Sequence, residues 1–364
     1  MSLQQILRAW TRARKTHRDV TWRERNAAPE GGDWPQRVVY LSPDSERPTG
    51  GVKIFYQHVE ALRKLGVDAN VMHEARGFRC RWFASSAPVL CQDDLRPGDF
   101  AVVPEVMPHA ALRLRTRGVP YAMFVQNGYL VLEVGSIDDV RSAYEGAVAA
   151  LAISDDTLDL LQRLLPGAQV PMIRVRHSVD ATRFRPADKQ MLATYMPRKM
   201  AQHARLVCGW LAMAHPNWRF QALDGLSEAQ VAEALGRSRV FLAFSEYEGL
   251  PLPPIEAALA GNIVIGYPGW GALEYWRRPL FHGVGFGDVR AFVQSFGEAA
   301  SNLSAMASDT AVARAALAQV FGAEAERELL VAAARRLNWL PAEATVGPVN
   351  AFAQECVKST GVTE

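Results

Sequence analysis

The sequence has few cysteines, almost no net charge and no long apolar run. No stretch of about 18 consecutive apolar residues occurs among its 364 residues, so no segment is predicted to span a membrane. The four cysteines form no Cys-x-x-Cys pair, and we expect reduced thiols rather than disulfides or zinc fingers. A net charge of +2 disfavours nucleic acid as a main partner. We therefore expect a cytoplasmic protein.

A dinucleotide-binding fingerprint is also missing. No Gly-x-Gly-x-x-Gly motif follows the first predicted strand at 38–41, which argues against a nicotinamide-dependent dehydrogenase. There is no short-period repeat and no low-complexity segment. Because the chain is longer than one typical hydrophobic core requires, its length favours two domains.

Residues 1–26 are rich in arginine and carry apolar residues at helical spacing. Seven basic residues accompany the apolar positions Leu3, Ile6, Leu7 and Trp10, which predicts a short basic amphipathic helix. The segment lacks the continuous apolar centre of a signal peptide. Two interpretations stay open: a helix solvated or packed on its own protein, and a peripheral contact with an anionic membrane at its inner face.

From residue 36 onward, apolar runs typical of buried strands alternate with helical patterns. In the first half, strands are predicted at 38–41, 67–72, 100–103, 119–125, 148–153 and 170–175. In the second half, they are predicted at 192–196, 219–223, 240–244 and 263–265. Alternation of this kind predicts an α/β protein with mainly parallel sheets and helices on both faces.

Four segments follow from this pattern. We predict a basic helical extension at 1–35, a Rossmann-like domain at 36–186, a second and smaller Rossmann-like domain at 187–340, and a C-terminal tail at 341–364. Ligands of such domains bind beyond the carboxyl ends of the strands, so functional residues are expected directly after strands.

The strongest functional signal follows the strand predicted at 240–244. Glu248 lies in a loop shaped by glycine and proline, and Glu256 lies on the helix after it. A carboxylate can accept hydrogen bonds from two vicinal hydroxyls, and the amino end of a helix can bind a phosphate. The pattern therefore predicts a site for a long ligand that carries both hydroxyls and phosphate.

This stretch resembles the Glu-x7-Glu signature of retaining glycosyltransferases with the GT-B fold, in the large fourth family (glycosyl transferases group 1). Other segments are similar to the family in the same order along the chain. Residues 50–52 resemble its first glycine loop, 179–186 its domain join, and 269–274 its next glycine loop. The similarity covers about residues 37–290.

The resemblance implies the GT-B fold, two Rossmann-like domains facing across a cleft, with the acceptor bound by the first and the donor by the second. It implies that Glu256 binds the ribose hydroxyls, that Glu248 faces the donor sugar, and that Arg198 and Lys199 hold the diphosphate. The other residues expected at the site are Ser245, Gly249, Leu250, Leu252, Gly50, Gly51 and Asn127.

A polar side chain of the first domain should complete the site, because the family often places a histidine there. Two places could supply it. One is His109, and the other is Gln126 and Asn127, which directly follow the strand predicted at 119–125. A lone histidine is more often structural, and the place after a strand favours Asn127.

The sequence departs from the family pattern at several places. Pro251 stands in the usual Gly-Phe-Gly-Leu-Pro loop and has no amide hydrogen to donate to the donor. His177 and Ser178 replace the usual Asn-Gly before the domain join, and the basic pair 198–199 is compressed. The missing donor at Pro251 leaves the identity of the sugar open.

The implied activity is transfer, with retention, of a hexose or deoxyhexose to a glycan or glycolipid acceptor, in bacterial polysaccharide or glycoconjugate biosynthesis. The resemblance implies a UDP-, dTDP- or GDP-linked donor and neither a metal nor another cofactor. Two alternatives remain: an inverting transferase or nucleotide-sugar epimerase on the same fold, and a non-catalytic protein that binds nucleotide sugars or carbohydrate.

Overall fold

A computed structural model describes residues 35, 37–46, 49–91, 94–167 and 169–340. The helix predicted within 1–26, the tail 341–364 and Cys356 lie outside the described residues. Cys80, Cys91 and Cys208 are buried. Within the described ranges, every helix is too short or too polar to cross a membrane.

The first domain is built on a seven-stranded parallel sheet. Its spatial order is β3-β2-β1-β4-β5-β6-β7. The strands are β1 (Arg37–Leu41), β2 (Ala69–His73), β3 (Val89–Cys91), β4 (Asp99–Pro104), β5 (Tyr121–Val125), β6 (Ala149–Ala152) and β7 (Met172–Arg174). The order reverses direction between β1 and β4, where doubly wound sheets bind their ligands.

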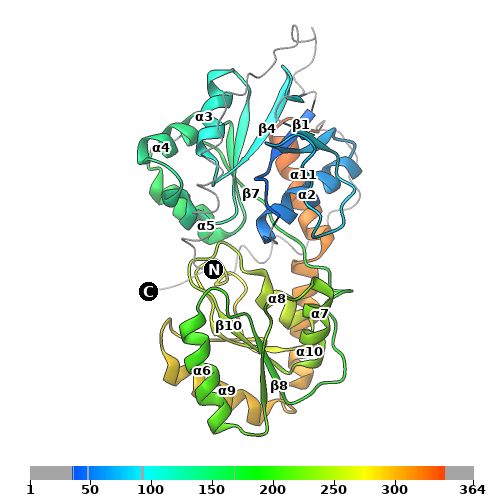
Figure 1. Cartoon of the computed structure of the whole chain (residues 1–364), viewed down its shortest axis with the longest axis vertical. Helices are drawn as coiled ribbons and strands as arrows, with labels where there is room; N and C mark the ends of the chain where they lie inside the picture. The colour runs from blue at the N-terminus through cyan, green and yellow to red at the C-terminus, as the bar shows by residue number, and fades with distance from the viewer. Residues whose placement is uncertain (1–34, 36, 47–48, 92–93, 168, 341–364) are drawn as a thin grey trace.

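Helices cover both faces of this sheet (Figure 1). They are α2 (Gly50–Lys64), α3 (Pro108–Thr116), η3 (Gly128–Glu133), α4 (Ile137–Glu145) and α5 (Asp155–Leu164). Successive strand residues point to opposite faces. In β1, Val38 and Tyr40 therefore pack into the core beside α2, and Val39 and Leu41 pack into the core beside α3 and α4.

The second domain repeats the scheme with a five-stranded parallel sheet in the order β12-β11-β10-β8-β9. Its strands are β8 (Leu192–Tyr195), β9 (Arg219–Ala222), β10 (Val240–Phe244), β11 (Ile263–Tyr267) and β12 (Phe281–Gly283). Its helices are α6 (Ala201–Ala214), α7 (Glu228–Arg237), α8 (Leu252–Leu259), α9 (Val289–Asn302) and α10 (Ala307–Val320). The helix α7 begins with a capping box formed by Ser227 and Gln230.

The last described helix, α11 (Ala323–Arg336), returns to the first domain and lies beside α2 (Figure 1). After it, the ring of Trp339 packs edge-on against Phe100 and Tyr40, with centroid distances of 5.3 and 6.5 Å. The chain thus crosses between the domains twice. One hydrophobic core runs from the α2 side of the first sheet to the α8 side of the second.

Candidate functional site

Loops at the carboxyl ends of the two sheets contact each other directly. Asn127, after β5, donates from Nδ2 to the carbonyl of Tyr247, after β10, at 2.9 Å. In the first domain, Gln126 donates from Nε2 to the carbonyl of Gly51 at 3.0 Å. The predicted residues Asn127 and Gly51 therefore belong to one continuous set of loops at the domain interface.

Gly249 sits where the two domains approach most tightly. A Cβ atom at this position would lie 1.9 Å from the carbonyl oxygen of Gln126 and 2.8 Å from Cα of Asn127. No side chain fits in that space. Glycine is therefore required here by the contact between the two domains.

The structure brings Glu248 and Lys199 together as an ion pair. Lys199 comes from the turn after β8, and Glu248 from the loop after β10. The side chain of Glu248 is 15% exposed, and its carbonyl accepts from the Gly271 amide at 3.1 Å. Arg198 is exposed beside Lys199, and no hydrogen bond of its side chain is found in the described part of the chain. A cation of this turn thus faces one of the two predicted acids.

Glu256 lies half-buried on α8, near charges from both domains. Lys53 of α2 pairs with Glu228 at 2.6 Å, and Arg183 of the domain join pairs with the same carboxylate. Burial raises the pKa of Glu256 to about 7; Glu228 adds to the rise, and Lys53 and Arg183 oppose it. The sequence reasoning missed these three neighbours, although Lys53 follows the glycine loop at 50–51.

The amino end of α8 offers few amide donors. Pro251 is the N-cap, and both the second and third helical positions are prolines, Pro253 and Pro254. None of them carries an amide hydrogen, and the first turns of helices supply the donors that bind anions. Between residues 249 and 254, only Gly249, Leu250 and Leu252 have a backbone amide hydrogen that could be donated to a ligand. The carbonyl of Pro251 accepts from the Tyr275 hydroxyl at 2.7 Å.

Glu105, after β4, is a residue that sequence reasoning missed. It is 5% exposed, and its Oε1 accepts from the Asn127 amide at 3.0 Å. Burial raises the pKa of this carboxyl to about 7, against the opposing effect of the backbone amides. Glu105 therefore positions the loop that carries Asn127. The alternative candidate His109 is exposed in the first turn of α3.

The remaining predicted residues surround these contacts. Ser245 and Leu250 are buried, Leu252 is half-buried, and Gly50 is exposed. A Cβ at Gly269 would lie 3.2 Å from Cβ of Ser245, so Ser245 packs under the next glycine loop.

A second set of hydrogen bonds between the domains involves Glu274, which follows the glycine loop at 269–271. Arg174 of β7 donates to its two carboxylate oxygens at 2.8 and 3.0 Å. The amide of Asp155, the first residue of α5, donates to the same group at 2.9 Å. These hydrogen bonds fix the orientation of the two domains at one end of the interface.

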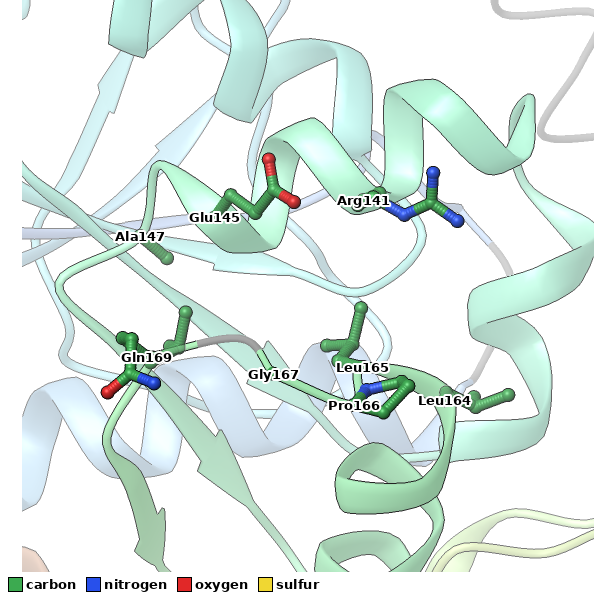
Figure 2. A pocket seen from close by; sticks show the side chains of 9 residues that line it. Arg141, Glu145, Ala147, Leu164, Leu165, Pro166, Gly167 and Gln169 are labelled. Carbon is green, nitrogen blue, oxygen red and sulfur yellow. The ribbon is translucent and has the colours of Figure 1, made fainter.

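A surface pocket of the first domain lies elsewhere (Figure 2). Its lining comes from the end of α4, including Arg141 and Glu145, and from residues 164–167, 169 and 170. These segments lead into the amino ends of β6 and β7, the edge of the sheet opposite to the interdomain loops. None of the predicted site residues lines this pocket, so we do not assign the activity to it.

Comparison with known proteins identifies the fold. No protein-family model matches the sequence. An alpha-1,6-glucosyltransferase of Actinobacillus pleuropneumoniae is 26% identical over 249 residues, which is 64% of this chain and 73% of that protein. A sucrose-phosphate synthase of Thermosynechococcus elongatus superposes with a TM-score of 0.63 at 14% identity, covering 83% of this chain and 99% of its own. The chain has the GT-B fold.

A second solved GT-B structure agrees. HepE of Anabaena, solved in complex with UDP and glucose, gives a TM-score of 0.63 at 12% identity over 82% of this chain and 99% of its own. The fold class predicted from the sequence is confirmed.

Proposed function

We propose that this chain is a glycosyltransferase that moves a hexose or deoxyhexose from a nucleotide diphosphate to an acceptor hydroxyl. The observation that carries the proposal is the Lys199–Glu248 ion pair at the domain interface. The residue before Glu248, Tyr247, accepts a hydrogen bond from Asn127 of the other domain. The similarity to a protein named as a glucosyltransferase supports the same conclusion.

Each charged group has a role in this proposal. Glu256, with a pKa near neutrality, accepts hydrogen bonds from the ribose hydroxyls when it is ionised. Lys199 and Arg198 stabilise the charge that develops on the departing diphosphate. Glu248 pairs with Lys199 and faces the donor sugar. Asn127 completes the sugar site from the first domain.

The finer features also belong to the proposal. We expect retention at the anomeric carbon, no metal in the reaction, and a UDP-, dTDP- or GDP-linked donor. The expected acceptor is a bacterial surface glycan or glycolipid, with peripheral membrane contact through residues 1–26.

The test is an assay for release of nucleoside diphosphate from a panel of UDP-, dTDP- and GDP-sugars, with and without glycan acceptors. We expect turnover with one donor, and a loss of at least about 100-fold in kcat/KM for Arg198→Ala and Glu256→Ala. Glu298→Ala, an exposed acid on α9, is the matched control. Turnover that both site variants leave unchanged would refute the proposal.

The same experiment separates the alternatives. The anomeric configuration of the product, read by NMR, distinguishes retention from inversion. Donor binding without any release would point to the non-catalytic protein.

A further inference from the structure

A second cluster of chemically active side chains is buried where the chain crosses between the domains. It consists of His58 on α2, His177 after β7, and Glu326 on α11. They are 0, 2 and 8% exposed. One ligand atom from each residue lies within 4.8 Å of the other two. Three separate segments thus bring two imidazoles and a carboxylate together inside the protein.

Some polar atoms in and beside the cluster have no hydrogen-bond partner among the described residues. His58 Nε2 lies 3.4 Å from Glu326 Oε1 and 3.3 Å from the Arg176 carbonyl. Nδ1 of His58, Nδ1 of His177 and the hydroxyl of Tyr40 have no hydrogen-bond partner among the described residues. The ring of Tyr40 stands edge-on to that of His58 at 6.0 Å. A bound water or ion at the cluster would give such buried atoms a partner.

We propose that His58, His177 and Glu326 bind one divalent transition-metal ion, most readily zinc. Two imidazoles and one carboxylate are a donor set that suits zinc and its neighbours rather than magnesium or calcium. Zinc bonds of about 2.0 to 2.1 Å place tetrahedral ligands about 3.3 Å apart. The separation of 3.4 Å between His58 Nε2 and Glu326 Oε1 already fits this requirement.

A neighbouring hydroxyl supports the carboxylate. The Ser178 hydroxyl donates to Oε2 of Glu326, the oxygen that does not approach His58. Hydrogen bonds of this kind hold a metal ligand in its binding orientation. A water would fill the fourth position of the ion.

Such an ion would join the two crossover segments to the first domain. These segments already contact each other, because the Val179 amide donates to the Phe321 carbonyl at 2.8 Å and Arg176 donates to the Val320 carbonyl at 3.0 Å. The metal would add a bond from each segment to α2. It would therefore stabilise the connection between the domains, and it does not depend on the proposed transfer reaction.

The test is a zinc titration of the full-length chain, stripped with EDTA and then exchanged into chelator-free buffer, against a competing chromophoric chelator. We expect one tightly bound zinc per chain. His177→Asn and Glu326→Gln should each weaken binding by at least about 100-fold. Cobalt in place of zinc should give the intense visible absorption of a tetrahedral site in the parent protein, and this absorption should be lost in His177→Asn and Glu326→Gln.

Histidines outside the cluster provide the controls. His109→Asn and His203→Asn change an exposed and a half-buried histidine and should bind zinc like the parent. Glu326→Gln preserves the shape of the side chain, so it keeps the test valid if a histidine variant fails to fold. Zinc affinity that is equal in the parent and in both cluster variants, or no stoichiometric binding at all, would overturn the proposal.

Discussion

Two carboxyl groups at the domain interface have pKa values raised to about 7, and their surroundings differ. Glu105 is enclosed by its own domain and accepts a backbone amide. Lys53 and Arg183 lower the pKa of Glu256, but burial raises it by more. A ligand that donates hydroxyl hydrogen bonds favours the ionised form of a carboxyl group. Donor binding at Glu256 should therefore release a proton near neutral pH.

For Glu256 we predict pH-dependent donor affinity. Because its pKa is about 7, the ionised fraction falls about tenfold for each pH unit well below that value. The Kd for the nucleoside diphosphate of the preferred donor, measured by calorimetry, should rise about tenfold between pH 8 and pH 6. Glu256→Gln should retain only the dependence that comes from the ligand's own phosphate. Equal pH dependence in both proteins would contradict the assignment.

For Glu105 we predict an effect on stability. Its pKa rises from 4.5 in its ordinary state to about 7 in the folded protein. The folded state therefore binds this proton more tightly than the unfolded state, and the free energy of unfolding falls as the pH rises from about 4.5 to 7. The contribution is up to about 3 kcal/mol.

Glu105→Gln removes this titration, so its urea-unfolding free energy should change less between pH 5.5 and 8 than that of the parent protein. At pH 8 the variant should be the more stable of the two, because it buries no charge. Parallel pH curves for the two proteins would show that Glu105 is not the titrating group.

Gly249 gives a third prediction at this scale. Gly249→Ala places a methyl group 1.9 Å from the Gln126 carbonyl, so the domains must separate at this point. We expect kcat/KM to fall at least about tenfold, because a shift of about 1 Å in a site costs that much or more. Gly209→Ala on α6 is the control, since its Cβ meets nothing within 4 Å. Small-angle scattering should show a more open chain for Gly249→Ala alone.

Among the elements, α8 is the most unusual. It lies at the centre of the candidate site, but two prolines occupy its first turn and a third is its N-cap. Proline is well tolerated in a first turn, where the amides have no partner within the helix, so the helix itself is not weakened. The prolines instead reduce the number of hydrogen-bond donors for a ligand, because the missing amides are those that would face a phosphate.

Pro253→Ala restores one of these amides. An added donor at a helix amino end contributes about 0.3 to 1 kcal/mol toward an anion, so the Kd for the nucleoside diphosphate should fall about two- to fivefold. Calorimetry at low salt measures this change. Glu298→Ala, remote on α9, should leave the Kd at its parent value. Weaker or unchanged binding in Pro253→Ala would mean that the phosphates do not lie at this helix end.

The elements that sequence patterns missed are short. The strands β3 and β12 have three residues each, and α4 has nine. Periodicity needs several residues to become visible, so such elements are detected only through their neighbours. The longer patterns were confirmed, including the strand at 240–244.

At the scale of the whole molecule, α11 and the residues after it fasten the second half of the chain onto the first domain. Trp339 is 5% exposed and packs against Phe100 and Tyr40. Truncating a buried tryptophan costs about 3 to 5 kcal/mol. Trp339→Ala should lower the urea-unfolding free energy by that amount, whereas Trp210→Ala, 46% exposed on α6, should lower it by less than about 1 kcal/mol. Equal losses in the two variants would exclude this role for Trp339.

The sequence alone determined the alternation of strands and helices and the fold class, because local periodicity carries that information, and a short motif predicted the two acids at positions 248 and 256. Tertiary structure decided which groups meet. Asn127 contacts Tyr247 across 120 positions, and Glu105 supports Asn127 from a neighbouring strand. The crossover of α11 and the cluster at His58 depend on the same kind of contact. Such pairings come from the packing of distant segments, and no spacing along the chain encodes them.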